Sequence, residues 1–325
     1  MRKTFLLSGC ILLLAAIIFF ANGCPTSCFS NKNSPIAKPL ALDTVAPIPK
    51  TNDFAFAYIV PHDVRVKSYF YFMDTLLRRL DTLVAYDLNE YLLARTNPWL
   101  IDSFVETDYD HRKARGEFVY DQKQLLILRA GDTLFVPADS LAAKIKAKQA
   151  KTWLDVNLPE FKMRIVEGAD TLFSFPVRIG QNRKQYVEVL DRTEDLRTKT
   201  GVGAILRVNR SPSWTNPVTG KKYKDTGRDD GQRTQLPQVP WLEPALNGFR
   251  WGQMIHPTTN SETLGKTYSN GCIGTSEANA WRVYFYAPVG TKVVVRNDRR
   301  IISPKNDTIW LKDVYDPKKF KRRVL

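Results

Sequence analysis

One cysteine and one histidine are the residues of this sequence best suited to carry out chemistry. Cys272 is the only one of 4 cysteines that lies beyond the N-terminal thirty residues, and His256 is the only one of 3 histidines in the C-terminal half. The two positions are 16 residues apart. A thiol becomes a nucleophile when an imidazole takes its proton, because the thiolate is the reactive form. The pair therefore predicts covalent thiol catalysis, and a buried structural cysteine beside an unrelated histidine is the competing hypothesis.

The residues next to Cys272 predict the groups that would support such a reaction. The backbone N–H of Cys272, and that of Gly271, are candidates for an oxyanion hole, because glycine lets the chain approach closely. Ser269 is expected to hydrogen-bond across the turn that contains Asn270. A helix is expected to begin after Cys272 with Ser276 as its N-cap, so that its dipole favours the thiolate.

The full string around these residues resembles the signature of L,D-transpeptidases with a YkuD-type catalytic domain. The matching residues are Ile255-His256, Thr259-Asn260, Leu264-Gly265-Lys266 and Ser269-Asn270-Gly271-Cys272-Ile273, and the resemblance runs from about residue 152 to about residue 295. It implies a mainly β catalytic domain, a YkuD-like β-sandwich with one helix after the catalytic cysteine. It also implies Cys272 as nucleophile, His256 as base and the carbonyl of Pro257 as the group that orients the imidazole.

The resemblance implies a reaction on peptidoglycan stem peptides. Cys272 would attack the amide that joins residue 3 of a tetrapeptide stem to D-Ala, and an amine of a second stem would resolve the thioester as a 3→3 cross-link. Water in place of the amine would make the protein an L,D-carboxypeptidase. No cofactor and no metal is implied. Two further hypotheses are a non-catalytic wall-binding lipoprotein and a different thiol hydrolase.

Two positions depart from the family pattern. Many members have His where this chain has Asn270, and many have Arg where it has Gly274, so substrate choice is expected to differ. The segment 211–214 resembles the family's Pro-x-Trp segment beside the active site. The candidates for lining the substrate cleft are Trp214, Trp241, Thr258 and Gly274, and each tryptophan could instead pin its loop to the body.

Period-two alternation from residue 152 predicts the strands that position the site. Strands are expected at 153–157, 162–166, 172–180, 204–208 and 292–296, within a catalytic domain at 151–298. Residues 210–247 are rich in Pro, Gly and charge and lack periodicity. A segment this long is usually functional or disordered, so we predict a lid-like loop.

The N-terminus has the form of an export signal. A short basic start precedes an apolar run, so residues 1–23 are predicted to be a signal peptide or an uncleaved anchor. Cys24 is the lipidation candidate, and residues 24–50 form a Pro-rich tether. We expect an extracytoplasmic, membrane-tethered protein, a lipoprotein that faces the periplasm.

Residues 51–150 predict a small α+β domain of unknown role. Helices are expected from residue 66 to about 83, from 88 to 95, and from Asp139-Ser140, as its cap, to about 150. Residues 124–128 and 133–137 are predicted to form a hairpin. His62 and His111 have no ligand spacing. Residues 299–325 predict a C-terminal hairpin and a basic tail.

The composition limits the partners. The formal net charge of +15 indicates a solvated basic surface, or attraction to an anionic polymer or surface. No helix-turn-helix, zinc-ligand or RNA-binding aromatic signature accompanies this charge, so nucleic acid is not expected as a partner.

Overall fold

The computed structural model describes residues 45–46, 53–188, 191–216, 220–302 and 306–316. Contacts divide the chain into residues 1–40 and 41–325, and every described residue belongs to the second unit. The predicted signal peptide or anchor at 1–23, Cys24 and most of the tether lie outside the described residues. In the part that is described, no helix is long and apolar enough to span a bilayer.

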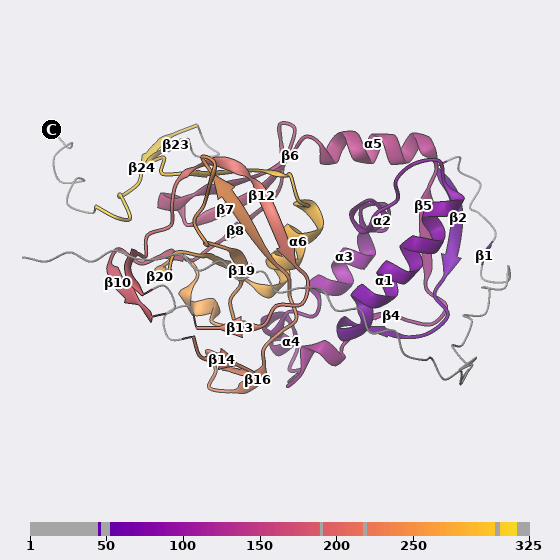
Figure 1. The fold of residues 1–325 in the computed structure, drawn as a ribbon, viewed down its shortest axis with the longest axis horizontal. Coiled ribbons are helices and arrows are strands. Elements are labelled where there is room, and N and C mark those ends of the chain that lie inside the picture. The colour runs from indigo at the N-terminus through magenta and orange to yellow at the C-terminus, as the bar shows by residue number, and fades with distance from the viewer. Residues whose placement is uncertain (1–44, 47–52, 189–190, 217–219, 303–305, 317–325) are drawn as a thin grey trace, which may run out of the picture. The chain divides into compact units, whose positions relative to one another are not determined.

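A nine-stranded sheet forms the C-terminal body (Figure 1). Its order is β21-β19-β17-β12-β22-β6-β7-β8, with β18 paired to β17, and only β19–β21 and β22–β6 are parallel pairs. Burial alternates along β22, as period two requires of a strand with one face in a core. The strands are β6 Thr152–Asn157, β7 Lys162–Glu167, β8 Asp170–Pro176, β12 Gly201–Asn209, β17 Trp241–Leu246, β18 Phe249–Arg250, β19 Ile255–Pro257, β21 Ile273–Thr275 and β22 Lys292–Arg296.

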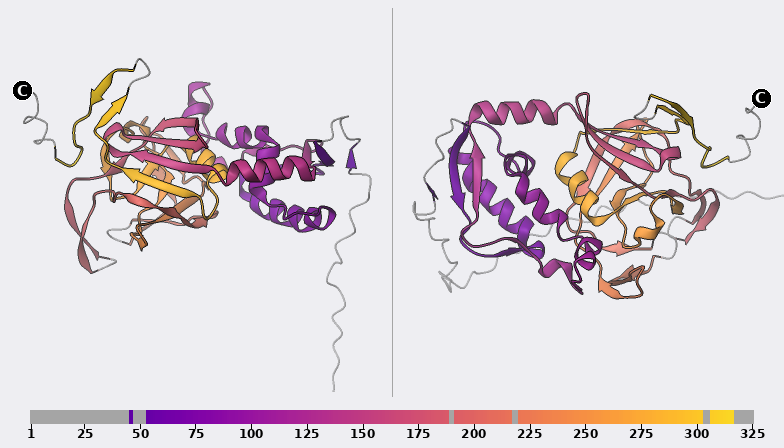
Figure 2. Two further views of the ribbon diagram at one scale, coloured as in Figure 1. Left: turned by 90° about the horizontal axis from the view of Figure 1, so that it is seen from above. Right: turned by 180° about the vertical axis from the view of Figure 1, so that it is seen from behind.

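The two ends of this sheet meet. Arg178, just after β8, bridges Gly274 in β21: the amide of Arg178 donates to the Gly274 carbonyl at 2.8 Å, and that of Gly274 donates back at 3.0 Å. The sheet is therefore nearly closed, as the two further views in Figure 2 allow the reader to follow. The predicted mainly β class is confirmed, and the sandwich is made by one sheet that curves back on itself.

The helix α6, Glu277–Tyr286, lies between two cores. Val283 and the following Ala287 belong to the core of the sheet, whereas Trp281, Tyr284 and Phe285 belong to the core of the N-terminal region. Ser276 is its N-cap, as predicted, because the Ser276 hydroxyl accepts from the amide of Asn279 at 3.2 Å.

The N-terminal region is a small α+β domain, as predicted, but it contains two helices that the sequence patterns did not indicate. Pro98 is the reason for the difference, since it stops α2 and also occupies the first position of α3, where proline is favourable. Helix α5 begins without a side-chain cap, and its N-cap is Ala138 rather than Asp139-Ser140. The helices are α1 Val66–Leu80, α2 Glu90–Thr96, α3 Pro98–Val105, α4 Tyr109–Ala114 and α5 Asp139–Gln149.

The hairpin predicted from residues 124–128 and 133–137 is wrong. Strand β4 (Leu126–Leu128) pairs with β3 (Val64–Arg65), and β5 (Thr133–Pro137) pairs with β2 (Phe54–Ile59), which also pairs with β1 (Val45–Ala46). The turn between β4 and β5 is bound by Val60, whose amide donates to Asp132 and whose carbonyl accepts from Gly131. Partners about seventy residues earlier in the chain therefore replace the local pairing.

The lid-like loop is shorter than residues 210–247. Its last part is β17, which lies between β12 and β19 in the sheet. Pro244 lies inside this strand although proline cannot donate to a ladder, and it pairs with Ile205 where the register of β12 shifts. The earlier part forms two hairpins: β13 (Trp214–Thr215) with β14 (Lys222–Tyr223), and β15 (Asp225–Gly227) with β16 (Arg233–Gln235).

Three further strand pairs complete the described structure. Strand β9 (Ile179–Gly180) is parallel to β20 (Thr267–Ser269), and β10 (Lys184–Val187) pairs with β11 (Arg192–Asp195). Strands β23 (Arg300–Ile302) and β24 (Thr308–Trp310) pair where the C-terminal hairpin was expected. Short 3-10 turns are η2 Asp81–Leu83, η3 Gln122–Gln124, η4 Leu158–Glu160 and η6 Ser261–Thr263.

Candidate active site

The parallel pair β19–β21 brings Cys272 and His256 together. Ile255 lies opposite Ile273, and the amide of Ile273 donates to the Met254 carbonyl at 2.9 Å. Cys272 therefore lies beside Met254. In this register His256 lies opposite Gly274, two residues after Cys272. The 16 residues that separate His256 and Cys272 in the sequence therefore connect two neighbouring parallel strands.

The imidazole of His256 is held in one tautomer. Its Nδ1 lies 2.7 Å from the Pro257 carbonyl, as predicted, and a carbonyl only accepts, so Nδ1 carries the proton and Nε2 is left to accept one. The ring of Trp214 packs on the imidazole with 5.6 Å between centroids. Burial, with a further contribution from the charge of Arg178, lowers the pKa of His256 to about 4. The base is therefore neutral and ready to accept at neutral pH.

The thiol of Cys272 is also neutral at rest. Burial raises its pKa, although the amide of Met254, which donates to Sγ at 3.4 Å, and the cation of Arg178 act in the opposite direction. The expected help from the α6 dipole is wrong. The three residues of β21 separate Cys272 from α6, and three extended residues advance the chain by about 10 Å. The dipole of α6 acts only within about its first turn, so it does not reach the thiol. The proton must therefore leave the thiol as the attack occurs.

The turn before Cys272 is fixed by hydroxyl groups. The hydroxyl of Ser269 donates to the Cys272 carbonyl at 2.5 Å and accepts from the Gly271 amide at 3.3 Å. The amide of Gly271 is therefore engaged, whereas that of Cys272 has no protein partner among the described residues and is free for an oxyanion. Asn270 lies in the same turn, half-buried.

Thr198 and Gln253 support this turn, and the sequence patterns did not single them out as site residues. The Thr198 hydroxyl donates to the Gly271 carbonyl at 2.8 Å and accepts from the Gly180 amide at the same distance. Gly271 has a φ of +108°, and a Cβ there would lie 2.7 Å from Nε2 of Gln253. Gln253 is itself held by the backbone of residues 197 and 199, so only glycine fits at 271.

Gly274 makes room for a cation. A Cβ at this position would lie 2.5 Å from Nε of Arg178, whose side chain passes over it. The Arg178 guanidinium donates to the Thr263 hydroxyl at 3.3 Å. Nothing in the sequence pattern predicts this neighbour, because closure of the sheet alone brings Arg178 to Gly274.

Two of the predicted cleft residues have other contacts. Thr258 is buried, its amide donates to the Thr275 carbonyl at 2.7 Å, and its hydroxyl bonds to the backbone of Asn260. Trp241 is buried in β17 with the guanidinium of Arg207 4.8 Å from its ring centroid, which favours a pinning role. Trp214 remains the cleft candidate.

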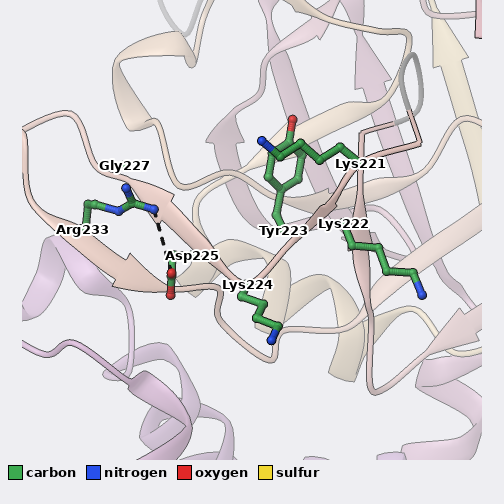
Figure 3. Close-up of a pocket in the computed structure, with 7 residues that line it drawn as sticks. All are labelled: Lys221, Lys222, Tyr223, Lys224, Asp225, Gly227 and Arg233. Carbon is green, nitrogen blue, oxygen red and sulfur yellow. Dashed lines mark ion pairs between the residues drawn. The ribbon is translucent and has the colours of Figure 1, made fainter.

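The hairpins beside Trp214 enclose two hollows. One, of about 510 Å³, is lined by residues 211–214 and 235–238 together with Lys123 and residues 223–225. Figure 3 shows the other, of about 410 Å³, where Lys222 and Lys224 extend to the same side of the chain and Arg233 pairs with Asp225. Neither hollow is lined by Cys272 or His256, so only the first, through Trp214, adjoins the site.

A buried ion pair fastens these hairpins to α6 and to the N-terminal region. The Arg228 guanidinium donates to the Glu277 carboxylate at 2.6 Å and to the Gln122 side chain at 2.8 Å, and it lies 4.2 Å from the ring centroid of Tyr109. The amide of Tyr109 donates to the same carboxylate at 3.1 Å. Across the described ranges, no group of three acidic, His or Cys side chains is arranged to hold a metal.

Comparison with known proteins identifies a family for the C-terminal body. Residues 151–295 match the model of the YkuD family, the L,D-transpeptidase catalytic domain. The predicted resemblance is confirmed. Both Cys272 and His256 lie within the matched residues.

Two relatives and two solved structures illustrate the likeness. A Bacillus subtilis protein named as a candidate L,D-transpeptidase, YciB, is 28% identical over 152 residues, which are 46% of this chain and 67% of the relative. A candidate L,D-transpeptidase from the ATP synthase region of Fuscovulum blasticum is 32% identical over 109 residues, 32% of this chain and 52% of the relative. The chain thus spans about two thirds of the first and about half of the second.

The solved structures are more distant. An L,D-transpeptidase structure from Xylanimonas cellulosilytica has 14% identity and a TM-score of 0.34, over 64% of this chain and 94% of that one. One from Mycobacterium smegmatis has 15% identity and a TM-score of 0.30, over 45% of this chain and 58% of that one.

Proposed function

We propose that this protein is a peptidoglycan-modifying cysteine L,D-transpeptidase. One observation carries the proposal: the β19–β21 register sets Cys272 beside the strand of His256, while the bond from Nδ1 to the Pro257 carbonyl leaves Nε2 free to take the thiol proton. The match of residues 151–295 to the YkuD family supports peptide stems of the cell wall as substrate.

The reaction divides into two acyl transfers. Nε2 of His256 takes the proton of Cys272 as Sγ attacks the carbonyl between stem residue 3 and D-Ala. The amide of Cys272 stabilises the oxyanion, His256 returns the proton to the leaving amine, and D-Ala departs as the thioester forms. His256 then deprotonates the amine of a second stem, which attacks the thioester, forms the 3→3 amide and releases the thiol.

The decisive experiment uses full-length protein in detergent with disaccharide-tetrapeptides, analysed by mass spectrometry. We expect dimers with loss of D-Ala, which are absent with Cys272→Ala and strongly reduced with His256→Gln. Ser103→Ala, a polar-to-Ala change in α3 away from the site, is the matched control. Tripeptides without dimers would establish an L,D-carboxypeptidase instead.

If the folded protein forms neither product, including on intact sacculi, the catalytic assignment fails and a wall-binding role takes its place. We also propose that the protein works outside the cytoplasm, tethered through its N-terminus and lipidated at Cys24, because its substrate would lie there. Mass spectrometry of the N-terminal peptide checks this, since an unmodified Cys24 in membrane-extracted protein would contradict lipidation.

A further inference from the structure

Arg178 is a half-buried cation without a carboxylate partner among the described residues. Among the residues that the structure describes, it forms no ion pair, its Nε is buried without a hydrogen-bond partner, and its one side-chain bond is the 3.3 Å contact to Thr263. Burying a charge without a counter-charge is costly. Arg228, which is buried, is by contrast fully matched by Glu277. The guanidinium of Arg178 therefore has unused hydrogen-bond donors and an unmatched charge, as expected of a group that binds an anionic ligand.

The acidic groups nearest to Arg178 are engaged elsewhere. Asp229 and Tyr268 act on its charge from a distance, but neither is within ion-pair distance. The Asp229 carboxylate accepts from the amide of Glu262 at 2.9 Å, which holds it at the start of η6. The remaining anionic group that acts on Arg178 is the thiolate form of Cys272. The side chain of Arg178 also passes over Gly274, two residues after Cys272, so the cation lies near the proposed nucleophile.

We propose that Arg178 binds the free C-terminal carboxylate of the donor stem. This inference rests on the proposed function and adds the residue that recognises the donor. In a tetrapeptide stem the carboxylate belongs to the D-Ala that leaves, within about 4 Å of the attacked carbonyl carbon. A cation whose side chain passes over Gly274, two residues after Cys272, has the reach to hold that carboxylate during the attack.

This assignment makes Arg178 a specificity-determining residue. A stem that is one residue longer carries its carboxylate about 3.5 Å further from the attacked bond, and a C-terminal amide has no charge. Both should be poor donors. A guanidinium can hold a carboxylate through two parallel bonds, which a lysine ammonium cannot reproduce, so Arg178→Lys should restore only part of the preference.

The first experiment compares a tetrapeptide donor with its C-terminal amide, using full-length wild type, Arg178→Gln and Arg178→Lys. Because hydrogen bonds to charged groups contribute about 1.5–3 kcal/mol, the wild type should prefer the acid by roughly 10- to 100-fold in kcat/KM. Arg178→Gln should lose this preference by acting more slowly on the acid while keeping its rate on the amide. Arg183→Gln, an exposed arginine in the same part of the chain, is the matched control.

Two results would overturn the inference. Equal kcat/KM of the wild type for the tetrapeptide acid and its C-terminal amide would show that the enzyme does not recognise the carboxylate. Equal losses on acid and amide in Arg178→Gln, with unchanged circular dichroism, would show that the arginine only supports the thiol or the fold.

A second experiment separates this inference from the proposed function, because it needs no peptide turnover. Cys272 is alkylated with anionic iodoacetate and with neutral iodoacetamide. The ratio of the two rates should fall about tenfold in Arg178→Gln relative to the wild type and to Arg183→Gln, since the cation attracts only the anionic reagent. An unchanged ratio overturns the anion site. A lowered ratio in a protein that turns over no stem peptide refutes the proposed function and leaves the anion site standing.

Discussion

The buried pair of Arg228 and Glu277 offers a sharp test of how the site is held. Arg228→Met removes the cation and leaves the Glu277 carboxylate, whose side chain is only 2% exposed, buried without a counter-charge, although the amide of Tyr109 still donates to it. Breaking a buried pair from one side costs about 3–5 kcal/mol, because the remaining charge is uncompensated. Two further bonds of the guanidinium, to Gln122 and Thr234, disappear as well.

The expected change in thermal stability is large. A loss of 1 kcal/mol lowers the Tm of a larger domain by about 2–4 °C, so Arg228→Met should melt roughly 6–20 °C below the wild type. Replacing both partners, as in Arg228→Met with Glu277→Leu, should recover part of this loss, since no charge is then buried alone. Differential scanning calorimetry of the full-length protein measures both values.

The matched control is Arg233→Met in the same hairpin pair. Its side chain is 76% exposed, and its nearest carboxylate oxygen is 3.9 Å away. Exposed pairs contribute less than about 1 kcal/mol, so the control should melt within a few degrees of the wild type. If Arg228→Met melts together with Arg233→Met, the pair does not fasten the hairpins, and the reasoning from burial is refuted.

Three further outcomes are expected. Burial raises the pKa of the Cys272 thiol, so its rate of alkylation by iodoacetamide should keep rising with pH above the pH at which free cysteine reaches its plateau. A plateau at low pH would instead reveal an ion-paired thiolate. On the acid side of the pH–rate profile, turnover should fall only near pH 4, where His256 gains a proton. Trp214→Ala should shift this fall to higher pH, because the imidazole becomes solvated, whereas Trp251→Ala, at an exposed position, should leave it unchanged. An unshifted profile in Trp214→Ala would contradict shielding of His256 by Trp214. Gly274→Ala should abolish the preference for the acid over the amide donor, because the new Cβ would displace the Arg178 side chain. Gly227→Ala should retain the preference, since a Cβ there would have no atom within 4 Å. If both variants retained the preference, the packing argument would be refuted.

The residues proposed for chemistry can be picked out from the sequence because most of their contacts are with residues close by in the chain or on the adjacent strand. The segment from His256 to Cys272 joins two adjacent parallel strands, so a short stretch of sequence brings both residues to neighbouring positions in the sheet. The orienting role of Pro257 follows in the same way, since the carbonyl belongs to the next residue. The Ser269 turn is likewise built from neighbours in sequence.

What could not be predicted depends on long-range pairing. Arg178 reaches Gly274 only because β8 and β21 meet when the sheet closes. The strand β17 has no period-two pattern because it is buried at nearly every position, and its Pro244 is tolerated at a register shift that only the folded sheet reveals. The local hairpin at 124–137 failed because β2 and β3 compete for its two strands, and no short-range rule measures that competition.

The aromatic face of α6 limits how this protein can be divided. Trp281, Tyr284 and Phe285 are fully buried, and Phe104 stacks on Trp281 with 4.2 Å between ring centroids. Each aromatic side chain buries about 150–250 Å², so a fragment that begins at residue 151 would expose a continuous apolar patch of several hundred Å². The YkuD-type segment of this chain is thus inseparable from the region before it: recombination at residue 150 would yield an aggregating product.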